Sequence, residues 1–212
     1  MPVVWLIRHG ESESNANLKT THPAHSALTE RGDEEARRVA QAIAERPDLI
    51  VVSPYLRAQQ TAVPTLTKFP DTPSATWPVE EFTYLDPIAY KNTTGADRWP
   101  AANAYWEQND PQLKHGGKGE SFAELMGRVQ GLQTQLRQQA AEFIVLFSHG
   151  LFLRAFLFTQ ILGRHDPSPE MMERYRHFIW GVNMPNCAIL KMTIPANGRF
   201  TFSGYDTDHL TN

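Results

Sequence analysis

Residues 3–12 read Val-Val-Trp-Leu-Ile-Arg-His-Gly-Glu-Ser, an apolar run that ends abruptly in charged residues and glycine. A short apolar run with such an ending is typical of a buried strand. The pattern returns at residues 143–150, where Phe-Ile-Val-Leu-Phe leads into Ser-His-Gly. A third run, at residues 49–52, leads into Ser53-Pro54. We therefore expect three buried strands, each followed directly by polar residues.

Helical segments are predicted between these strands. Thr29 is a candidate N-cap for an amphipathic helix that runs to about Glu45. Ser53 followed by Pro54 has the pattern of a capping residue before a first-turn proline. Residues 121–136 begin with capping-box spacing, and residues 150–162 are largely apolar. Strands that alternate with helices predict a three-layer α/β/α sandwich around a mostly parallel central sheet.

Two further regions complete the predicted organisation. Residues 188–194 and 199–205 have the pattern of late strands, joined by a hairpin turn at Asn197-Gly198. Residues 83–119 are rich in Pro, Gly, Asn and Trp and lack clean periodicity. A long irregular insertion in a compact domain is more often functional than accidental, so we expect it to lie over the active site.

The composition fits a single soluble domain over residues 1–212, with 41% hydrophobic and 20% charged residues. The 20 basic and 23 acidic side chains give a formal charge of -3, which favours neither nucleic acid nor a membrane as partner. The single cysteine fits a reducing compartment, and the first apolar run is too short for a signal sequence. We expect a cytoplasmic protein; the sequence leaves its oligomeric state open.

The polar residues after the strands include groups that could bind and attack a phosphoryl group. They are Arg8, His9, Arg57, Glu80 or Glu81, and His149. In parallel sheets such residues converge beyond the carboxyl ends of the strands. Guanidinium groups would offset the phosphoryl charge, an imidazole would attack phosphorus, and a carboxylic acid would protonate the departing alkoxide. The pattern predicts phosphoryl transfer without a metal ion.

The sequence resembles the histidine phosphatase superfamily, also called the phosphoglycerate mutase-like family. Five motifs in family order carry the resemblance. They are Leu6-Ile-Arg-His-Gly-Glu-Ser12, Leu28-Thr-Glu-Arg-Gly32, Ser53-Pro-Tyr-Leu-Arg57-Ala-Gln-Gln-Thr61, Gly119-Glu-Ser121 and Ser148-His-Gly150. Residues 178–194 resemble the family's closing strand. Together these motifs are far more specific than any one of them alone.

The resemblance implies a phosphatase that works through a phosphohistidine intermediate and needs no cofactor. His9 would be the nucleophile and His149 a second imidazole at the phosphoryl group. The implied phosphate-binding residues are Arg8, Asn15, Arg57, His149 and Gly150. The family pattern of an apolar residue, any residue, then glutamate maps onto Val79-Glu80-Glu81 and favours Glu81 as proton donor. Residues 82–87 depart from the Gly-x-Trp-x-Gly that often follows in the family.

Two other functions stay open. A phosphoglycerate-type mutase would return the phosphate to a bound sugar acid, with basic residues of its insertion on the substrate carboxylate. The insertion here offers only Lys91, Arg98, Lys114 and Lys118, so hydrolysis of a small phosphorylated metabolite is favoured. A non-catalytic module that binds a phosphorylated ligand is the third possibility, and the complete set of Arg8, His9, Arg57 and His149 argues against it. The identity of the substrate is left open.

Overall fold

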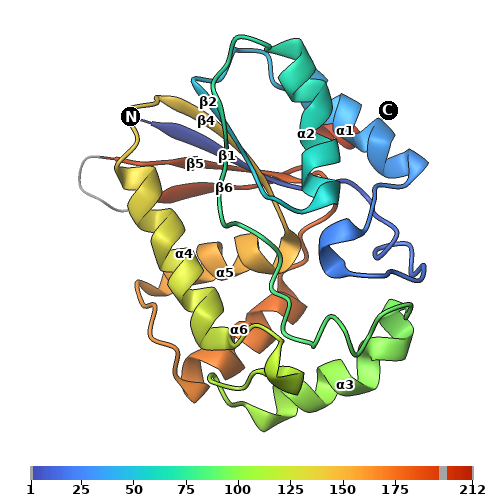
Figure 1. The fold of residues 1–212 in the computed structure, drawn as a ribbon. Coiled ribbons are helices and arrows are strands. Elements are labelled where there is room, and N and C mark those ends of the chain that lie inside the picture. The colour runs from blue at the N-terminus through green and yellow to red at the C-terminus, as the bar shows by residue number, and fades with distance from the viewer. Residues whose placement is uncertain (1, 196–199, 212) are drawn as a thin grey trace.

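The computed structural model describes residues 2–195 and 200–211, which build one six-stranded sheet with helices on both faces (Figure 1). The strands are β1 (Val3–Arg8), β2 (Leu49–Val52), β3 (Ser74–Thr76), β4 (Phe143–Ser148), β5 (Ile189–Thr193) and β6 (Thr201–Asp206). They lie in the order β3-β2-β4-β1-β5-β6, and the first four are parallel. β5 pairs antiparallel with β1, and β6 pairs antiparallel with β5. The predicted sandwich with a mostly parallel sheet is confirmed.

Two helical layers cover the sheet because alternate strand residues point to opposite faces. The helices are α1 (Glu30–Ala42), α2 (Leu56–Lys68), α3 (Gly95–Gln108), α4 (Phe122–Arg137), α5 (Gly150–Leu162) and α6 (Pro169–Gly181). Ile144 and Leu146 of β4 join the core beneath α4 and α5, whereas Val145 and Phe147 join the core beneath α1 and α2. Three short 3-10 helices are η1 (Pro23–His25), η2 (His115–Gly117) and η3 (Asp208–Leu210).

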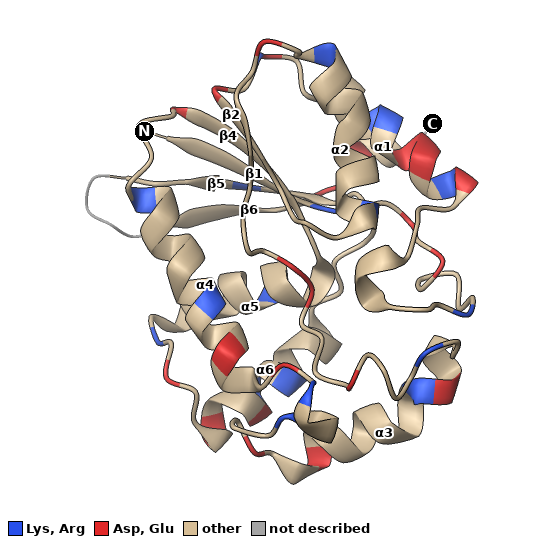
Figure 2. Cartoon of the chain, viewed as in Figure 1, with Lys and Arg blue, Asp and Glu red and all other residues tan. Residues whose placement is uncertain are grey.

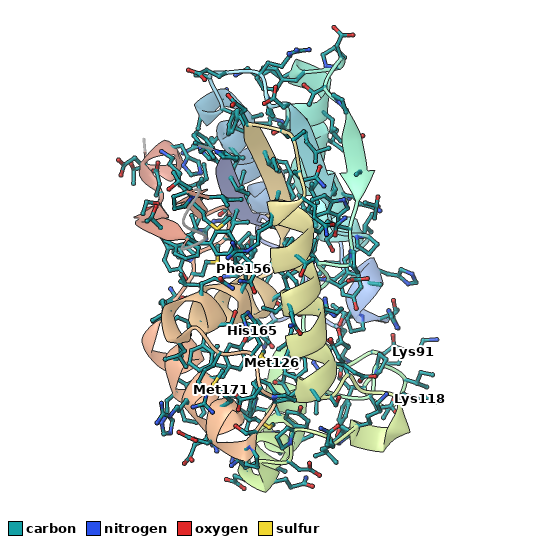
Figure 3. All side chains as sticks on the ribbon, turned by 90° about the vertical axis from the view of Figure 1, so that its left-hand side faces the viewer. Lys91, Lys118, Met126, Phe156, His165 and Met171 are labelled. Atoms are coloured by element: carbon teal, nitrogen blue, oxygen red, sulfur yellow. The ribbon has the colours of Figure 1, made fainter. Side chains whose placement is uncertain are left out.

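The helical layer built from α4, α5 and α6 has a large apolar core. Met126 of α4, Phe156 of α5 and Met171 of α6, which are labelled in Figure 3, are buried in one cluster. Charged residues lie mainly outside the sheet: Figure 2 draws β2 and β4 almost wholly in the colour of uncharged residues. Within the described residues, no helix combines the length and the apolar character that a membrane span needs.

The register of the two central strands sets up the site. Arg8 is the partner of Ser148 across β1 and β4, so the residues that follow, His9 and His149, leave the sheet side by side. The backbone N–H of His9 donates to the Ser148 carbonyl at 2.9 Å and extends this alignment by one residue. The strand ends therefore converge as the sequence predicted.

Two helix boundaries differ from the sequence-based expectation. The helix after β2 begins at Leu56, with Tyr55 rather than Ser53 at the N-cap. The Ser53 hydroxyl is hydrogen-bonded to His149 and also accepts from the backbone N–H of Tyr55 at 3.3 Å. Helix α1 is capped by Thr29 as expected but ends at Ala42. The Lys68 ammonium group donates to the carbonyl oxygens of Ala40 and Ile43 and satisfies this helix end.

The insertion at residues 83–119 is not irregular throughout, because α3 occupies Gly95–Gln108. Thr94 and Asp97 form a reciprocal capping box that starts this helix. Pro100 lies inside it, and few of its residues are buried, so the sequence lacks the amphipathic repeat that would predict a helix. A β-bridge between Thr20 and Thr93 joins the insertion to the loop after β1, and Figure 1 shows the two segments facing each other.

The C-terminal part also differs from the prediction. The expected closing strand at residues 178–194 is a strand only at Ile189–Thr193, because Phe178 belongs to α6. Ser168 caps α6 and Pro169 occupies its first turn, a start signal that sequence analysis passed over. The two late strands pair antiparallel, but the hairpin turn expected at Asn197-Gly198 lies outside the described residues.

Candidate functional site

His9 is held as a neutral imidazole whose Nε2 carries the electron pair. Its Nδ1 lies 2.7 Å from the Gly10 carbonyl oxygen, which can only accept, so Nδ1 carries the proton. Burial lowers the pKa of His9 well below its ordinary value, and the cationic Arg57 and Arg8 lower it further. A neutral imidazole with this tautomer presents Nε2 as a nucleophile.

Arg57 lies directly against His9 Nε2. It is the second residue of α2, is 5% exposed, and donates from Nε to His9 Nε2 at 3.0 Å. Its Nη1 donates to the Pro23 carbonyl at 2.5 Å, which ties it to η1. Burial lowers its pKa, while the nearby Glu81 carboxylate opposes the shift. A guanidinium group so placed can transfer its hydrogen bonds to a phosphoryl oxygen next to His9.

Arg8 extends from the end of β1 toward α5. Its Nη1 donates to the Met184 carbonyl at 2.5 Å, whereas its buried Nε has no hydrogen-bond partner within the described residues. A Cβ atom added at Gly150 would lie 3.1 Å from Arg8 Nε, so glycine allows this close approach. Burial lowers the pKa of Arg8. A buried donor without a partner at a strand end is well suited to an anionic ligand.

His149 provides the second imidazole, 5.1 Å from His9 between ring centroids. The residue is fully buried, and its Nε2 is hydrogen-bonded to the Ser53 hydroxyl at 2.7 Å. Its Nδ1 is also buried and unpartnered within the described part of the chain. Burial lowers its pKa well below the ordinary value, and Arg57 and His9 add to the shift. Ser53, expected only as a helix cap, thus orients this ring.

The two adjacent glutamates point to different partners. Oε1 of Glu81 accepts from the backbone N–H groups of Leu151 and Phe152 at 3.0 and 3.1 Å, in the first turn of α5 just after His149. Glu80 instead forms an ion pair with Arg128, at 3.3 Å. Of the two, Glu81 therefore lies at the start of α5, next to the residues that follow His149, and its role as proton donor stays a prediction.

Asn15 reaches the site through a residue that sequence analysis missed. Asn186 donates from Nδ2 to both the His9 carbonyl and Asn15 Oδ1, each at 3.0 Å. Asn15 Oδ1 also accepts from Ser12, so the Asn15 carbonyl is fully used and its amide nitrogen is left for a ligand. Asn186 precedes β5. Because β5 runs antiparallel to β1, its amino end lies at the carboxyl edge of the sheet, and that antiparallel pairing was the missing signal.

Gly10 is required by close packing rather than by a left-handed turn, since its φ is not positive. A Cβ atom there would lie 2.5 Å from the Gly32 carbonyl oxygen, and one on Gly32 would clash with the Glu11 carbonyl oxygen. Gly10 also donates its N–H to the Thr61 hydroxyl at 3.0 Å. Gly10, Gly32 and Thr61 belong to the motifs at residues 6–12, 28–32 and 53–61. These three motifs therefore contact one another here, and the contact fixes the loop that carries His9.

A cavity of about 220 Å³ is lined by two of these groups, Arg57 and Glu81, together with residues of the insertion. Its remaining walls come from the loop after β1 and from the start of the insertion. The lining residues include Ser14, Thr20, Thr21, His22, Tyr84, Asp86, Tyr90 and Arg98. The insertion therefore forms part of the cavity wall, as expected. The volume suits a small molecule.

The paired loop histidines do not form a metal-binding group with acidic or thiol neighbours. His22 and His25 lie with ring centroids 5.3 Å apart at η1, and His22 Nδ1 accepts from the Ala24 N–H at 3.1 Å. Across residues 2–195 and 200–211, no three His, Cys, Asp or Glu side chains are grouped as a metal site. His22 instead contributes to the cavity wall.

Comparison with known sequences gives a consistent set of relatives. The family model of the histidine phosphatase superfamily (branch 1) matches residues 4–203. A metal-independent phosphoserine phosphatase of Arabidopsis thaliana is 28% identical over 163 residues, which cover 72% of this chain and 66%, just under two thirds, of that protein. A protein named probable phosphoglycerate mutase GpmB, of Photorhabdus laumondii, is 30% identical over 165 residues, 76% of this chain and 74% of that one.

Solved structures share the fold over nearly the whole chain. The α-ribazole phosphatase of Shigella flexneri superposes with a TM-score of 0.74 at 25% identity, covering 97% of this chain and 96% of that one. A phosphoserine phosphatase of Entamoeba histolytica, solved with 3-phosphoglyceric acid, has a TM-score of 0.71 at 24% identity and full coverage of both chains.

Proposed function

The chain belongs to the histidine phosphatase superfamily, branch 1, and on this premise we propose that it is a metal-independent phosphoric monoester hydrolase. The proposed reaction forms a phosphohistidine on His9 and acts on a small phosphorylated metabolite. The observation that carries the proposal is the state of His9: neutral, protonated on Nδ1, with Nε2 against the Arg57 guanidinium group and a second imidazole nearby.

In the first proposed step, the phosphoryl group enters beside His9 and takes over the hydrogen bonds of Arg57. This exchange frees the Nε2 electron pair, which forms the N–P bond while the bond from phosphorus to the ester oxygen breaks. The buried unpartnered donors Arg8 Nε and His149 Nδ1 are available to the phosphoryl oxygens, with the Asn15 amide as a further donor. Glu81 gives its proton to the departing alkoxide.

In the second proposed step, water attacks the phosphohistidine and inorganic phosphate leaves. The Glu81 carboxylate, now deprotonated, accepts a proton from that water, and the N–P bond breaks to restore neutral His9. The same site groups offset the phosphoryl charge in both steps, so no metal ion is required. We also propose a cytoplasmic location, in keeping with the lone buried thiol of Cys187.

A mutase is the second candidate, since a relative of 30% identity is named as one. A mutase returns the phosphate to the bound acid and is expected to hold that acid with several cations. Of the four basic residues of the insertion, Arg98 alone lines the cavity beside Arg57, and Lys114 is paired with Glu124 at 2.5 Å. This arrangement supports transfer to water as the main outcome.

The test is a hydrolysis screen of the purified protein with phosphorylated metabolites and an aryl phosphate, with and without chelator. We expect release of inorganic phosphate at a rate that the chelator leaves nearly unchanged. Turnover that strictly requires an added divalent metal, or transfer of labelled phosphate to an acceptor hydroxyl without release, would replace this proposal with another one.

A further inference from the structure

The segment that carries Glu81 has no secondary structure of its own. Residues 77–83, which the structure describes throughout, form neither helix nor strand between β3 and the insertion. Glu81 nevertheless meets the first turn of α5 at well-defined distances, 3.0 and 3.1 Å to two backbone N–H groups. A catalytic group displaced by about 1 Å can lose roughly 100-fold in rate. A segment without strand pairing depends on contacts from other elements for such precision.

Arg128 of α4 binds this segment through one guanidinium nitrogen. Its Nη1 donates to the carbonyl oxygens of Pro78 and Glu80 at 3.2 and 3.0 Å, so it meets the backbone directly before Glu81. The guanidinium group also lies over Phe152, with its carbon 4.8 Å from the ring centroid. Phe152 supplies one of the two N–H groups that bind Glu81. One side chain therefore contacts both the segment and the helix turn that Glu81 binds.

Glu120 fixes the orientation of Arg128 and binds the same segment on the other side of Glu81. Its carboxylate accepts from Nε and Nη2 of Arg128 at 2.8 and 2.9 Å, the two parallel bonds that make an arginine–carboxylate contact rigid. Its backbone N–H donates to the Thr83 carbonyl at 2.8 Å. Arg128 thus holds the segment one residue before Glu81, and Glu120 holds it two residues after.

The pairing of Arg128 with Glu120 is costly to build. Both side chains are largely buried, and burial raises the pKa of Glu120, while the hydrogen bonds and charge of Arg128 oppose the rise. Replacement of such a pair by apolar residues of similar volume is often neutral or stabilising. A contribution to stability alone is therefore a weak reason for the pair, whereas the placement of a nearby functional group is a specific one.

Building on the proposed phosphatase function, we propose that Arg128 is a positioning residue for proton transfer by Glu81. Arg128, oriented by Glu120, holds the Glu81 carboxyl group where it gives its proton to the departing oxygen of the substrate. Arg128 itself touches no reacting atom: within the described residues its hydrogen bonds go to Pro78, Glu80 and Glu120. Its loss should therefore slow only those steps in which Glu81 transfers a proton.

The test is a double-mutant cycle of Arg128→Gln and Glu81→Gln with two substrates. Glycerol 3-phosphate releases an alkoxide, which needs a proton, and p-nitrophenyl phosphate releases a much weaker base. We expect Arg128→Gln to slow the single-turnover rate of the first by roughly 10- to 100-fold and the burst rate of the second by about threefold or less. In the Glu81→Gln background, Arg128→Gln should change the alkyl rate by less than about twofold, because both changes remove the same interaction.

Further variants separate positioning from folding, since Arg128→Gln leaves the Glu120 charge buried and unpaired. The Glu120→Gln, Arg128→Gln protein has no such charge and should show the same leaving-group-dependent loss, and Arg128→Lys should recover part of the alkyl rate. Arg174→Gln is the matched control, because Arg174 forms an exposed pair with Glu170 at 2.7 Å on α6. Its rates should equal those of the wild-type protein.

Three results would overturn the proposal. They are equal losses for both substrates, a loss of full size in the Glu81→Gln background, and wild-type rates in both proteins that carry Arg128→Gln. A structural role for Arg128 predicts the first or the second of these, because a general distortion of the site slows every substrate and does not depend on the Glu81 carboxyl group.

Turnover of p-nitrophenyl phosphate by the wild-type protein reports on the proposed phosphatase function separately. If neither substrate is hydrolysed, the hydrolase assignment fails, and amide hydrogen exchange still tests the positioning of Glu81. Exchange of the Leu151 and Phe152 N–H groups, which Glu81 accepts from, should accelerate in Arg128→Gln while the amides of β4 stay as slow as in the wild-type protein. Unchanged exchange at Leu151 and Phe152 would refute the proposal.

Discussion

The hydrogen bonds around His9 and His149 fix the position of the His9 proton and the orientation of the His149 ring. Gly10 fixes the proton on Nδ1, Arg57 covers Nε2, and Ser53 orients His149 through its Nε2. The buried donors that remain without partners, on Arg8 and His149, belong to residues expected at a phosphoryl group. In the proposed reaction, these donors would stabilise the negative charge on the phosphoryl oxygens.

The proton donor is predicted to be Glu81 rather than Glu80. Glu81→Gln should slow hydrolysis of an alkyl phosphate by roughly 10²–10⁴-fold, because an alkoxide leaves poorly without a proton. Phosphorylation of His9 by an aryl phosphate should slow far less, since a phenolate is a weaker base. Single-turnover rates for the alkyl substrate and burst rates for the aryl substrate measure both effects.

Glu80→Gln is the matched control, because Glu80 pairs with Arg128 and not with α5. Its rates should stay close to those of the wild-type protein. If Glu80→Gln instead showed the leaving-group-dependent loss, the assignment would be off by one residue. If neither variant showed it, Asp86, a buried carboxylate in the cavity wall, would be the next donor to test.

At the scale of elements, the site depends on the tight contact between the loop after β1 and the start of α1. Gly32→Ala should disturb this contact, because the added methyl group meets the Glu11 carbonyl oxygen. We expect a loss of roughly 1–3 kcal/mol in the free energy of unfolding, with a fall in kcat as the loop carrying His9 shifts. Chemical denaturation and steady-state kinetics on the same samples measure the two effects.

Gly127→Ala is the matched control for Gly32→Ala, and we expect it to stabilise the protein instead of destabilising it. Gly127 lies inside α4, and an added Cβ atom would meet no heavy atom within 4 Å. Alanine there should stabilise the protein by about 0.5–1 kcal/mol through helix propensity, with no change in kcat. A Gly32→Ala protein as stable and active as the wild type would show that the contact is not needed.

Elements with strong local signals were predictable from the sequence, and those defined by tertiary contacts were not. The capping-box spacing of Ser121 and Glu124 predicted the start of α4. The apolar run at residues 143–147 predicted β4, which extends one residue further, to Ser148. In contrast, α3 lacks an apolar face, and the role of Ser53 depends on His149, 96 residues away. Asn186 was missed because its place follows from strand pairing, which no local pattern reveals.

At the scale of the whole molecule, two buried neutral histidines make stability depend on pH. The pKa values of His9 and His149 both lie well below the ordinary value of 6.5 in the folded protein, chiefly because of burial. The unfolded chain therefore takes up these protons first as the pH falls below 6.5, so acidification favours unfolding. Their stabilising contribution is present above pH 6.5 and is lost as the pH falls toward the folded-state values.

The expected slope is about 1.4 kcal/mol per pH unit for each such histidine. Replacing His149 with Asn should remove one proton from the unfolding reaction, so the variant's stability should fall less steeply between pH 6.5 and 5. Urea denaturation of both proteins across this range measures the difference, and other titrating groups contribute equally to each. Parallel slopes would mean that His149 is not buried in its neutral form.

The sheet, the two helical layers and the insertion together bring distant segments to one site, where we propose that His9 becomes phosphorylated. The direct measurement is rapid quenching without acid after mixing with ³²P-labelled substrate, followed by peptide mapping. We predict acid-labile, base-stable label on the peptide containing His9, formed and lost at rates compatible with turnover, and absent from His9→Ala. Label on Ser12 or another residue, or phosphate release by the wild-type protein with no labelled His9 at any time, would contradict the account.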